Sequence, residues 1–154
     1  DKRVHKRKPV TPAFILAALL WPAREQHAKQ MIERGISAYD ARHAADAEAL
    51  DSQVKRTAIP RRFSGTVKDI WQLQWRMEER QKRHIRRTLE HPKFRAAYDF
   101  LLLRSEVGEV DPEVAQWWTA IQDETEEQQE QRIDQLTPSR TARKRPKKKP
   151  VNPQ

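Results

Sequence analysis

The residues of this sequence that could do chemistry are basic side chains gathered in a few segments. Residues 80–87 read RQKRHIRR and supply Arg80, Lys82, Arg83, Arg86 and Arg87. On a helix, Arg83 shares a face with Arg86 and Arg87, so these like charges repel one another. Such a stripe is easier to explain if an anion binds it. The alternative, equally open here, is a solvated face whose local partners are Glu78, Glu79 and Glu90.

The C-terminal segment 137–154 is also strongly basic, with seven basic and no acidic residues. Its cations are Arg140, Arg143, Lys144, Arg145, Lys147, Lys148 and Lys149. No carboxylate within the segment neutralises them, so nucleic acid is the expected partner. An inert solubility tail and a nuclear-import-type signal are the alternatives. The segment has almost no core-forming residues, and we expect it to be disordered alone.

A third basic feature is the pair Arg61 and Arg62, which directly follows Pro60. Because proline restricts the backbone, it limits where the two arginines can point. The pair could contact the phosphates of a nucleic acid, or one arginine could tie helices together through Asp69 or Asp99. We favour phosphate contact for at least one of the two.

The charge is segregated along the chain. The net charge is +9, yet residues 55–95 hold 13 basic and 4 acidic residues, and residues 123–134 hold six acidic and one basic. This distribution suggests a polyanionic partner at one surface, and solvent or self-shielding at another.

Catalytic and metal-binding patterns are absent from the sequence. With five histidines, no cysteine and no HExxH motif, a zinc site would need widely separated ligands. The three glycines form neither a GxSxG elbow nor a phosphate-binding loop. Asp46 and Glu48 lie two residues apart, so on a helix they point in different directions, and we interpret them as solvated surface. We predict no catalytic residue and no metal.

The elements that must position the basic residues are predicted to be helices. Glycine is rare, and long stretches of Ala, Leu, Glu, Gln, Lys and Arg favour an all-α fold of about five to six helices. We expect a basic linker over 1–10, a helical domain over 11–136 and a disordered Lys/Arg-rich tail over 137–154. No apolar run approaches the roughly 18 residues that a membrane span needs.

Cap residues and apolar spacing predict the helix limits and the core. Thr11 with Pro12 starts the first helix, Pro22 should kink or break it, and Gly35 should end it. A loop is expected over 57–65, with a helix starting at Thr66 and interrupted in its apolar stripe by Gln74. We expect core positions for three tryptophans, and either core or rim for Trp75. The three are Trp71, Trp117 and Trp118.

Several sequence blocks, in one order, carry a family resemblance over residues 10–121. They are TPAFILAALLWP, AIPRRF, DIWQLQWRM and LEHPKFRAAYDFLLLRSEVGEVDPE followed by WW, with a basic tail after them. Together they resemble the C-terminal part of the bacterial poly(A) polymerases. That family belongs to the class II nucleotidyltransferases, with the CCA-adding enzymes, and extends RNA 3′ ends with AMP from ATP.

The resemblance implies the RNA-binding, arginine-rich region without a catalytic head. The family's head carries a Gly-Ser pair followed by Asp-x-Asp carboxylates for two magnesium ions, and this sequence has no such set. We therefore expect a fragment that is inactive alone, with ATP and Mg²⁺ needed only by the head and no cofactor in this chain.

The resemblance also implies partners and a location. The basic residues named above would bind single-stranded RNA, RNA-decay proteins are further expected partners, and the location would be cytoplasmic. Two other functions stay open: a protein-interaction module whose basic tail docks acidic partners, with RNA incidental, and a basic DNA-associated protein.

Overall fold

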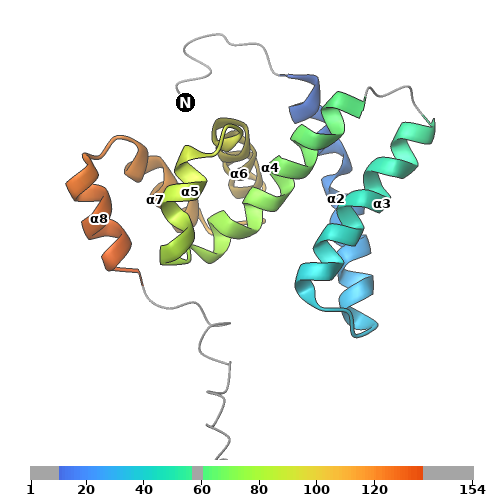
Figure 1. Cartoon of the computed structure of the whole chain (residues 1–154), viewed down its shortest axis with the longest axis horizontal. Coiled ribbons are helices and arrows are strands. Elements are labelled where there is room, and N and C mark those ends of the chain that lie inside the picture. Colours follow the sequence, from blue (N-terminus) through green and yellow to red (C-terminus); the bar gives the residue numbers. More distant parts are fainter. Residues whose placement is uncertain (1–10, 57–60, 137–154) are drawn as a thin grey trace, which may run out of the picture.

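The computed structural model describes residues 11–56 and 61–136, and within these ranges it is helical with no strands. The helices are α2 (Pro12–Glu33), α3 (Ala38–Arg56), α4 (Arg61–Glu79), α5 (Lys82–Glu90), α6 (Phe94–Glu106), α7 (Pro112–Gln122) and α8 (Glu126–Asp134) (Figure 1). The all-α prediction is confirmed. The seven described helices exceed the expected five to six because α4 and α5 are separate and the acidic segment forms α8.

The predicted caps account for several helix ends. The Thr11 side chain accepts a hydrogen bond from the Phe14 N–H at 3.3 Å, and Pro12 occupies the first helical position. Asp111 caps α7 in the same way, since it accepts from the Glu113 N–H at 2.9 Å. Each cap satisfies a backbone donor that has no partner within its helix.

Pro22 was expected to kink or break the helix, and the break does not occur, because α2 continues through it. Pro22 lies on the exposed face of α2, where water can reach the carbonyl that loses its intrahelical donor. Its neighbours Trp21 and Arg24 are buried on the opposite side. Packing of that side against the other helices outweighs the local cost of proline.

The predicted loop over 57–65 is also partly wrong. Residues 57–60 lie outside the described ranges, but α4 already begins at Arg61, so Thr66 is inside a helix and not at its cap. A glycine such as Gly65 costs an exposed helix only about 1 kcal/mol. Packing of Phe63 and Val67 against the core outweighs that cost.

The core consists of two apolar clusters that α4 joins. One lies between α2, α3 and the first part of α4 and also contains Phe100 of α6, and the other lies among the end of α4 and α5–α8. Trp71 is fully buried in the first and donates its indole N–H to the Ala17 carbonyl at 3.0 Å. Trp118 is fully buried in the second and donates to the Met77 carbonyl at 2.8 Å. The core predictions for these tryptophans, and for Trp117, are confirmed.

Gln74 is the polar residue that interrupts the apolar stripe of α4. It is buried, and both its amide nitrogen and its amide oxygen form hydrogen bonds. Its amide nitrogen donates to the carbonyls of Ile70 and Ala97 at 3.1 and 3.0 Å. Its oxygen accepts from Nη1 of Arg104 at 3.0 Å, and Nη2 of the same arginine donates to Glu78 at 3.1 Å. Gln74 therefore links α4 to α6 through buried hydrogen bonds.

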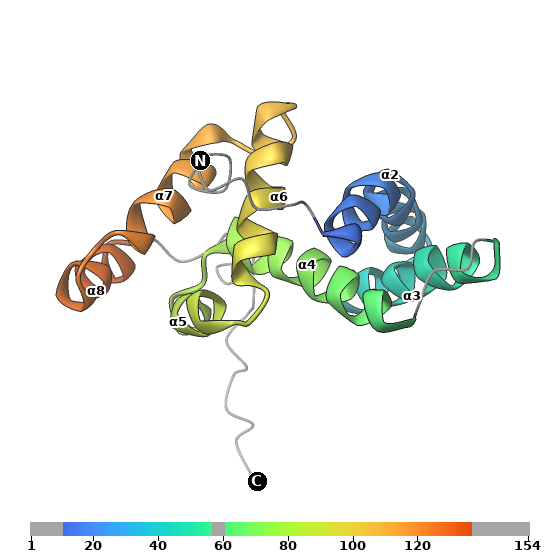
Figure 2. The same ribbon diagram turned by 90° about the horizontal axis from the view of Figure 1, so that it is seen from above.

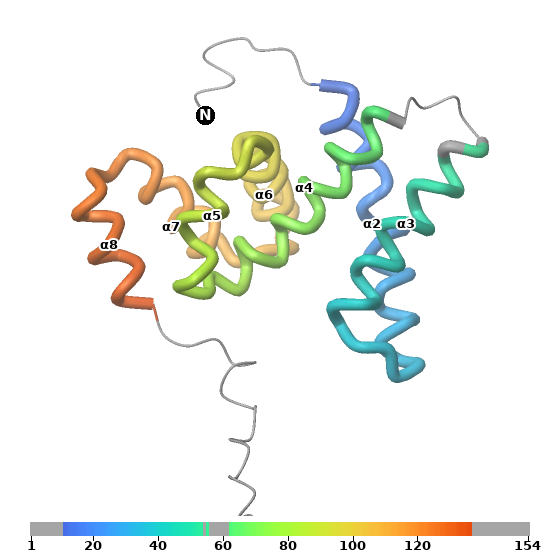
Figure 3. The backbone as a smooth tube through the Cα atoms, in the orientation of Figure 1, coloured from blue at the N-terminus to red at the C-terminus, as the bar shows by residue number. Residues whose placement is uncertain are grey.

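The arrangement in space follows from these contacts. α2 and α3 lie side by side as an antiparallel pair (Figure 3). α4 runs from this pair toward α5, and α6–α8 complete the other end (Figure 2). Within the described ranges, no helix combines the length and the apolar character that crossing a membrane would require.

Candidate nucleic-acid interface

Helix α5 carries most of the basic segment, and its buried side fixes its orientation. Ile85 and Thr88 are fully buried against the second cluster. Arg83 and Arg87 are exposed, four residues apart on the opposite side. The basic residues at 80–87 therefore divide into two sets with different surroundings.

The first set points toward α7 and α8. Arg80 donates to both carboxylate oxygens of Glu113, from Nη1 at 2.8 Å and from Nη2 at 3.0 Å. Lys82 donates from Nζ to the backbone carbonyl of Asp134 at 3.0 Å, at the end of α8. These two side chains hold helices together, which is a structural use of charge that the sequence did not indicate.

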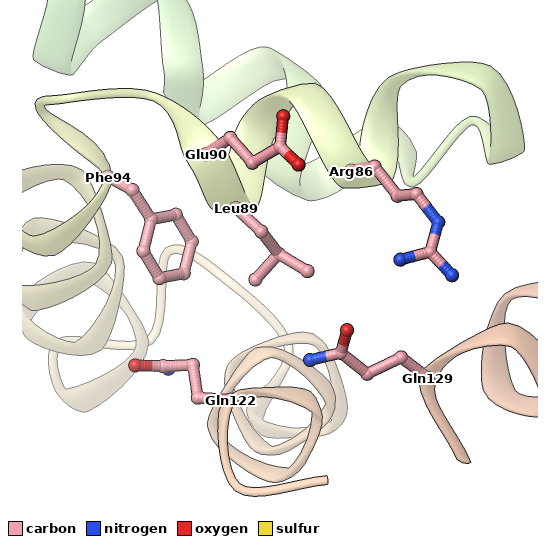
Figure 4. Close-up of a pocket in the computed structure, with 6 residues that line it drawn as sticks. All are labelled: Arg86, Leu89, Glu90, Phe94, Gln122 and Gln129. Carbon is pink, nitrogen blue, oxygen red and sulfur yellow. The ribbon is translucent and has the colours of Figure 1, made fainter. Parts of the chain in front are cut away.

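Arg86 belongs to the same set. Its Nη2 lies 3.3 Å from Oε1 of Glu130 on α8. Figure 4 shows Arg86 and Leu89 pointing from α5 toward the helices that carry Gln122 and Gln129. The pocket they enclose has a volume of about 380 Å³ and has no cluster of cations. This pocket lies where α5 packs near α7 and α8, and with Arg86 as the one cation among its described lining residues it is a poor site for a polyanion.

The second set contains the cations that remain available. The pKa of His84 is lowered, first by burial and then by the charges of Arg83, Arg76 and Arg87, so the three guanidinium groups lie near the imidazole. We call these four residues the basic cluster. Within the described ranges, no carboxylate forms an ion pair with any of the three arginines.

This arrangement fits the binding of phosphate groups. Arg83 also lines a pocket with Glu130 and Asp134, but none of the three guanidinium groups around the partly buried imidazole forms an ion pair among the described residues. The three groups repel one another, and an anion with several charges relieves that repulsion. Guanidinium groups also form paired hydrogen bonds with phosphate oxygens. Glu78 is not a local partner of these arginines, as the alternative interpretation required, because its carboxylate binds Arg104 instead.

The other predicted RNA contacts are the pair Arg61 and Arg62 and the cations of the C-terminal tail. Arg62 is exposed, with its guanidinium carbon 4.9 Å from the Phe63 ring centre. Arg61 begins α4, and its side chain lies outside the described part. Phosphate contact by the pair stays a prediction. The tail cations also lie outside the described residues: Arg140, Arg143, Lys144, Arg145, Lys147, Lys148 and Lys149.

Arg76 and His84 are the members of the basic cluster that sequence reasoning missed. His84 lies inside RQKRHIRR, and Arg76 lies seven residues before Arg83, close to two helical turns. Both signals are visible in the sequence. The separation of α4 from α5 at Arg80, which has a φ of 47°, is not visible there.

The interpretation of Asp46 as solvated surface is wrong. Asp46 is 1% exposed, and its Oδ1 accepts from Nε of the buried Arg24 at 2.6 Å. Ala41, Ala45 and Ala49 are buried on the same side of α3, so α2 approaches closely enough to cover the carboxylate. Burial is the main cause, and it raises the pKa of Asp46 against the opposing effect of Arg24.

Acidic and imidazole side chains do not gather into a metal site in the part of the chain that the structure describes. No group of three or more histidine, aspartate or glutamate residues there could hold a metal ion.

Comparisons with known proteins give one consistent result. Residues 34–151 match the family model described as "Polymerase A arginine-rich C-terminus". The chain is 39% identical to Poly(A) polymerase I of Salmonella typhi over 97% of this chain and 33% of that protein. It is 40% identical to Poly(A) polymerase I of Escherichia coli O6:H1 (94% and 32%) and 38% identical to that of Haemophilus influenzae (99% and 34%). The chain spans about a third of the length of these curated relatives.

Proposed function

The chain belongs to the polymerase A arginine-rich C-terminus family, and we propose that it is the RNA-binding C-terminal region of a poly(A) polymerase. On this proposal the whole enzyme adds AMP from ATP to RNA 3′ ends. This chain would bind part of the RNA, and the transfer of AMP would take place in another part of the enzyme.

The basic cluster is the observation that carries the proposal. Arg80, Lys82 and Arg86 each have a partner on α7 or α8, whereas Arg83 and Arg87 are exposed and lie close to a third arginine. Cations that are left free while their neighbours are paired are the ones available to a polyanion. Contacts with phosphates carry no base information, so sequence preference at the cluster should be weak.

The proposal extends to the tail and to the cofactors. The cations of residues 137–154 would add further phosphate contacts to those of the cluster. ATP and Mg²⁺ would bind residues that this sequence does not contain. A cytoplasmic location and an association with RNA-decay proteins are part of the same proposal.

A salt series with single-stranded RNA tests the function. Binding should be measured for residues 1–154, for a chain cut after Leu136 and for the variant Arg83→Gln/Arg87→Gln. For single strands the slope of log affinity against log salt is about −0.7 per phosphate neutralised. We expect the cut chain to bind with a shallower slope and the double variant to have a shallower slope than the unaltered chain.

Two results would contradict parts of the proposal. If the cut chain does not bind, the cluster is not an RNA site and the tail alone holds the strand. If the full chain does not bind at low salt, the RNA function itself is wrong, and a protein-interaction module becomes the better hypothesis. Duplex DNA of equal length is the control for the expected preference for single strands.

A further inference from the structure

A groove separate from the basic cluster is lined by residues of α2, α3, α4 and α6. Figure 1 shows how α4 runs away from the pair formed by α2 and α3. Its volume is about 920 Å³, the largest among the described pockets. Its lining is rich in indole and guanidinium groups. These are Trp21, Arg24, Arg42, Trp71, Trp75 and Arg104.

The guanidinium groups lie against the indole rings. The guanidinium carbon of Arg42 is 4.5 Å from the ring centre of Trp75. Trp21 has the guanidinium carbon of Arg104 at 4.5 Å and that of Arg24 at 5.1 Å. Trp21 is buried, whereas Trp75 and Arg42 are half-buried. The accessible flat surface is therefore the Arg42–Trp75 pair.

The charge of the groove differs from that of the basic cluster. Its lining holds four basic and three acidic side chains, so the charges nearly cancel. Ile32, 47% exposed, adds an apolar contact at the same groove. A phosphate gains little in such a place. A neutral planar ring gains contact with an apolar wall, an indole and a guanidinium plane at once.

The groove also contains a buried guanidinium group with one nitrogen that donates no hydrogen bond within the described ranges. Arg24 is 3% exposed, and its Nε and Nη1 donate to Asp46 and Glu25. Its Nη2 has no hydrogen-bond acceptor among the described residues. Buried donors are usually satisfied, so a small shift of this side chain toward the groove would let a ring nitrogen or carbonyl of a bound base accept from it.

The groove and the basic cluster are neighbours on α4. Trp75 lines the groove and Arg76 belongs to the cluster, and the Cα atoms of consecutive residues are about 3.8 Å apart. One turn of α-helix holds 3.6 residues, so the two side chains leave the helix about 100° apart. A strand whose phosphates contact the cluster can therefore present a base to the groove.

We propose that this groove binds an unpaired nucleobase of RNA, stacked on the Arg42–Trp75 pair. The proposal rests on the proposed function, because phosphate contacts at the cluster bring the strand to the groove. It adds a source of preference for single strands, since a base in a duplex is already stacked and paired. Stacking tolerates any base, so the site selects unpaired bases with little regard to sequence.

The test compares an oligoadenylate strand with a strand of the same length and backbone that lacks its bases. Stacking of one base is worth roughly a factor of ten in affinity. The unaltered 1–154 chain should bind the oligoadenylate about tenfold more tightly than the abasic strand. Trp75→Ala should remove most of that difference and leave the abasic affinity unchanged, and Trp75→Phe should keep part of it. A 2-aminopurine in the strand should change fluorescence with the unaltered chain and not with Trp75→Ala.

Further variants separate a lost site from a lost fold. Arg42→Gln changes the other half of the pair on α3, and it decides the matter if Trp75→Ala is unfolded by circular dichroism. Tyr39→Ala, an exposed aromatic on α3 outside the groove lining, is the matched control and should keep the tenfold difference.

Each remaining outcome overturns the proposal in a distinguishable way. Equal binding of both strands by the unaltered chain rules out the base site and leaves phosphate binding intact. A Trp75→Ala or Arg42→Gln variant that is folded and retains the tenfold difference also rules it out, and the groove is then free for a protein partner. If neither strand binds at low salt, the proposed RNA function fails first.

Discussion

Arg80 and Glu113 are joined by two parallel hydrogen bonds, from Nη1 and Nη2 to the two carboxylate oxygens, at 2.8 and 3.0 Å. Arg80 occupies the turn between α4 and α5 with a φ of 47°, and Glu113 lies in the first turn of α7. The pair fixes where α5 starts. It thereby separates the structural cations of the basic segment from those that face solvent.

This separation predicts different effects for two neighbouring arginines. Arg80→Ala should lower the free energy of unfolding by about 1 kcal/mol, because it removes a bidentate pair at a helix junction. Its effect on RNA affinity should be small. Urea unfolding and RNA binding measure the two effects. Arg83→Ala is the control and should show the reverse, and equal RNA effects for both variants would contradict the division into two sets.

The exposed pair on α5 should dominate the salt dependence of the helical part. In the chain cut after Leu136, Arg83→Gln/Arg87→Gln should reduce the steepness of the log–log salt slope by about 1.4, or about 0.7 for each lost phosphate contact. Stability should be unchanged or rise by about 0.3 kcal/mol, because like charges at i and i+4 repel. Matched salt titrations and thermal melts measure these effects. An unchanged slope would mean that neither arginine meets a phosphate.

His84 should make folding stability depend on pH. Its pKa is lowered in the fold by burial and then by Arg83, Arg76 and Arg87, so the unfolded chain binds more protons below the ordinary histidine pKa of about 6.5. The contribution of His84 to the free energy of unfolding is therefore fully present above about pH 6.5, and it decreases as the pH drops toward the lowered pKa. His84→Gln should flatten the unfolding free energy between about pH 7 and 5.

The control for this measurement must leave every titratable group of the chain in place. Because histidine substitutions elsewhere would add their own titration, the comparison is made instead with Gln30→Ala, an exposed neutral side chain on α2, which should retain the pH dependence of the unaltered chain. If His84→Gln and the unaltered chain lose the same free energy between those pH values, the imidazole does not titrate under the influence of the arginines.

Much of the fold could be predicted because its determinants are local. Thr11 with Pro12 marks a helix start by a hydroxyl acceptor and a fixed φ, whatever the rest of the chain does. Trp71 and Trp118 fall at apolar helical positions, and both are buried. The continuity of α2 through Pro22 could not be predicted, since it depends on which side of the helix faces solvent.

The candidate site was only partly predictable for the same reason. The sequence of segment 80–87 shows a concentration of cations, but it does not distinguish the cations that pair with other helices from those that face solvent. Glu113 and Glu130 lie more than 25 residues away, and only the folded chain brings them to Arg80 and Arg86. Asp46 was misread in the same way, because its partner Arg24 lies on another helix.

The acidic helix α8 should weaken the binding of RNA to α5. Residues 123–134 hold six acidic residues and one basic residue, and Glu130 lies 3.3 Å from Arg86. Glu130→Gln releases that guanidinium and removes a charge that repels phosphates. An exposed ion pair is worth up to about 1 kcal/mol, so RNA affinity at low salt should rise about two- to fivefold. The gain should shrink at high salt, where surface charges are screened.

Fluorescence anisotropy with labelled single-stranded RNA at two salt concentrations measures this gain. Glu127→Gln, an exposed carboxylate on the same helix, is the control and should give a smaller increase. A gain confined to Glu130→Gln means that Arg86 itself reaches the RNA once released. Equal gains from both variants mean that only the overall charge of α8 matters. No gain from either would show that the strand does not approach this side of α5, and would confine phosphate binding to the side that carries Arg83 and Arg87.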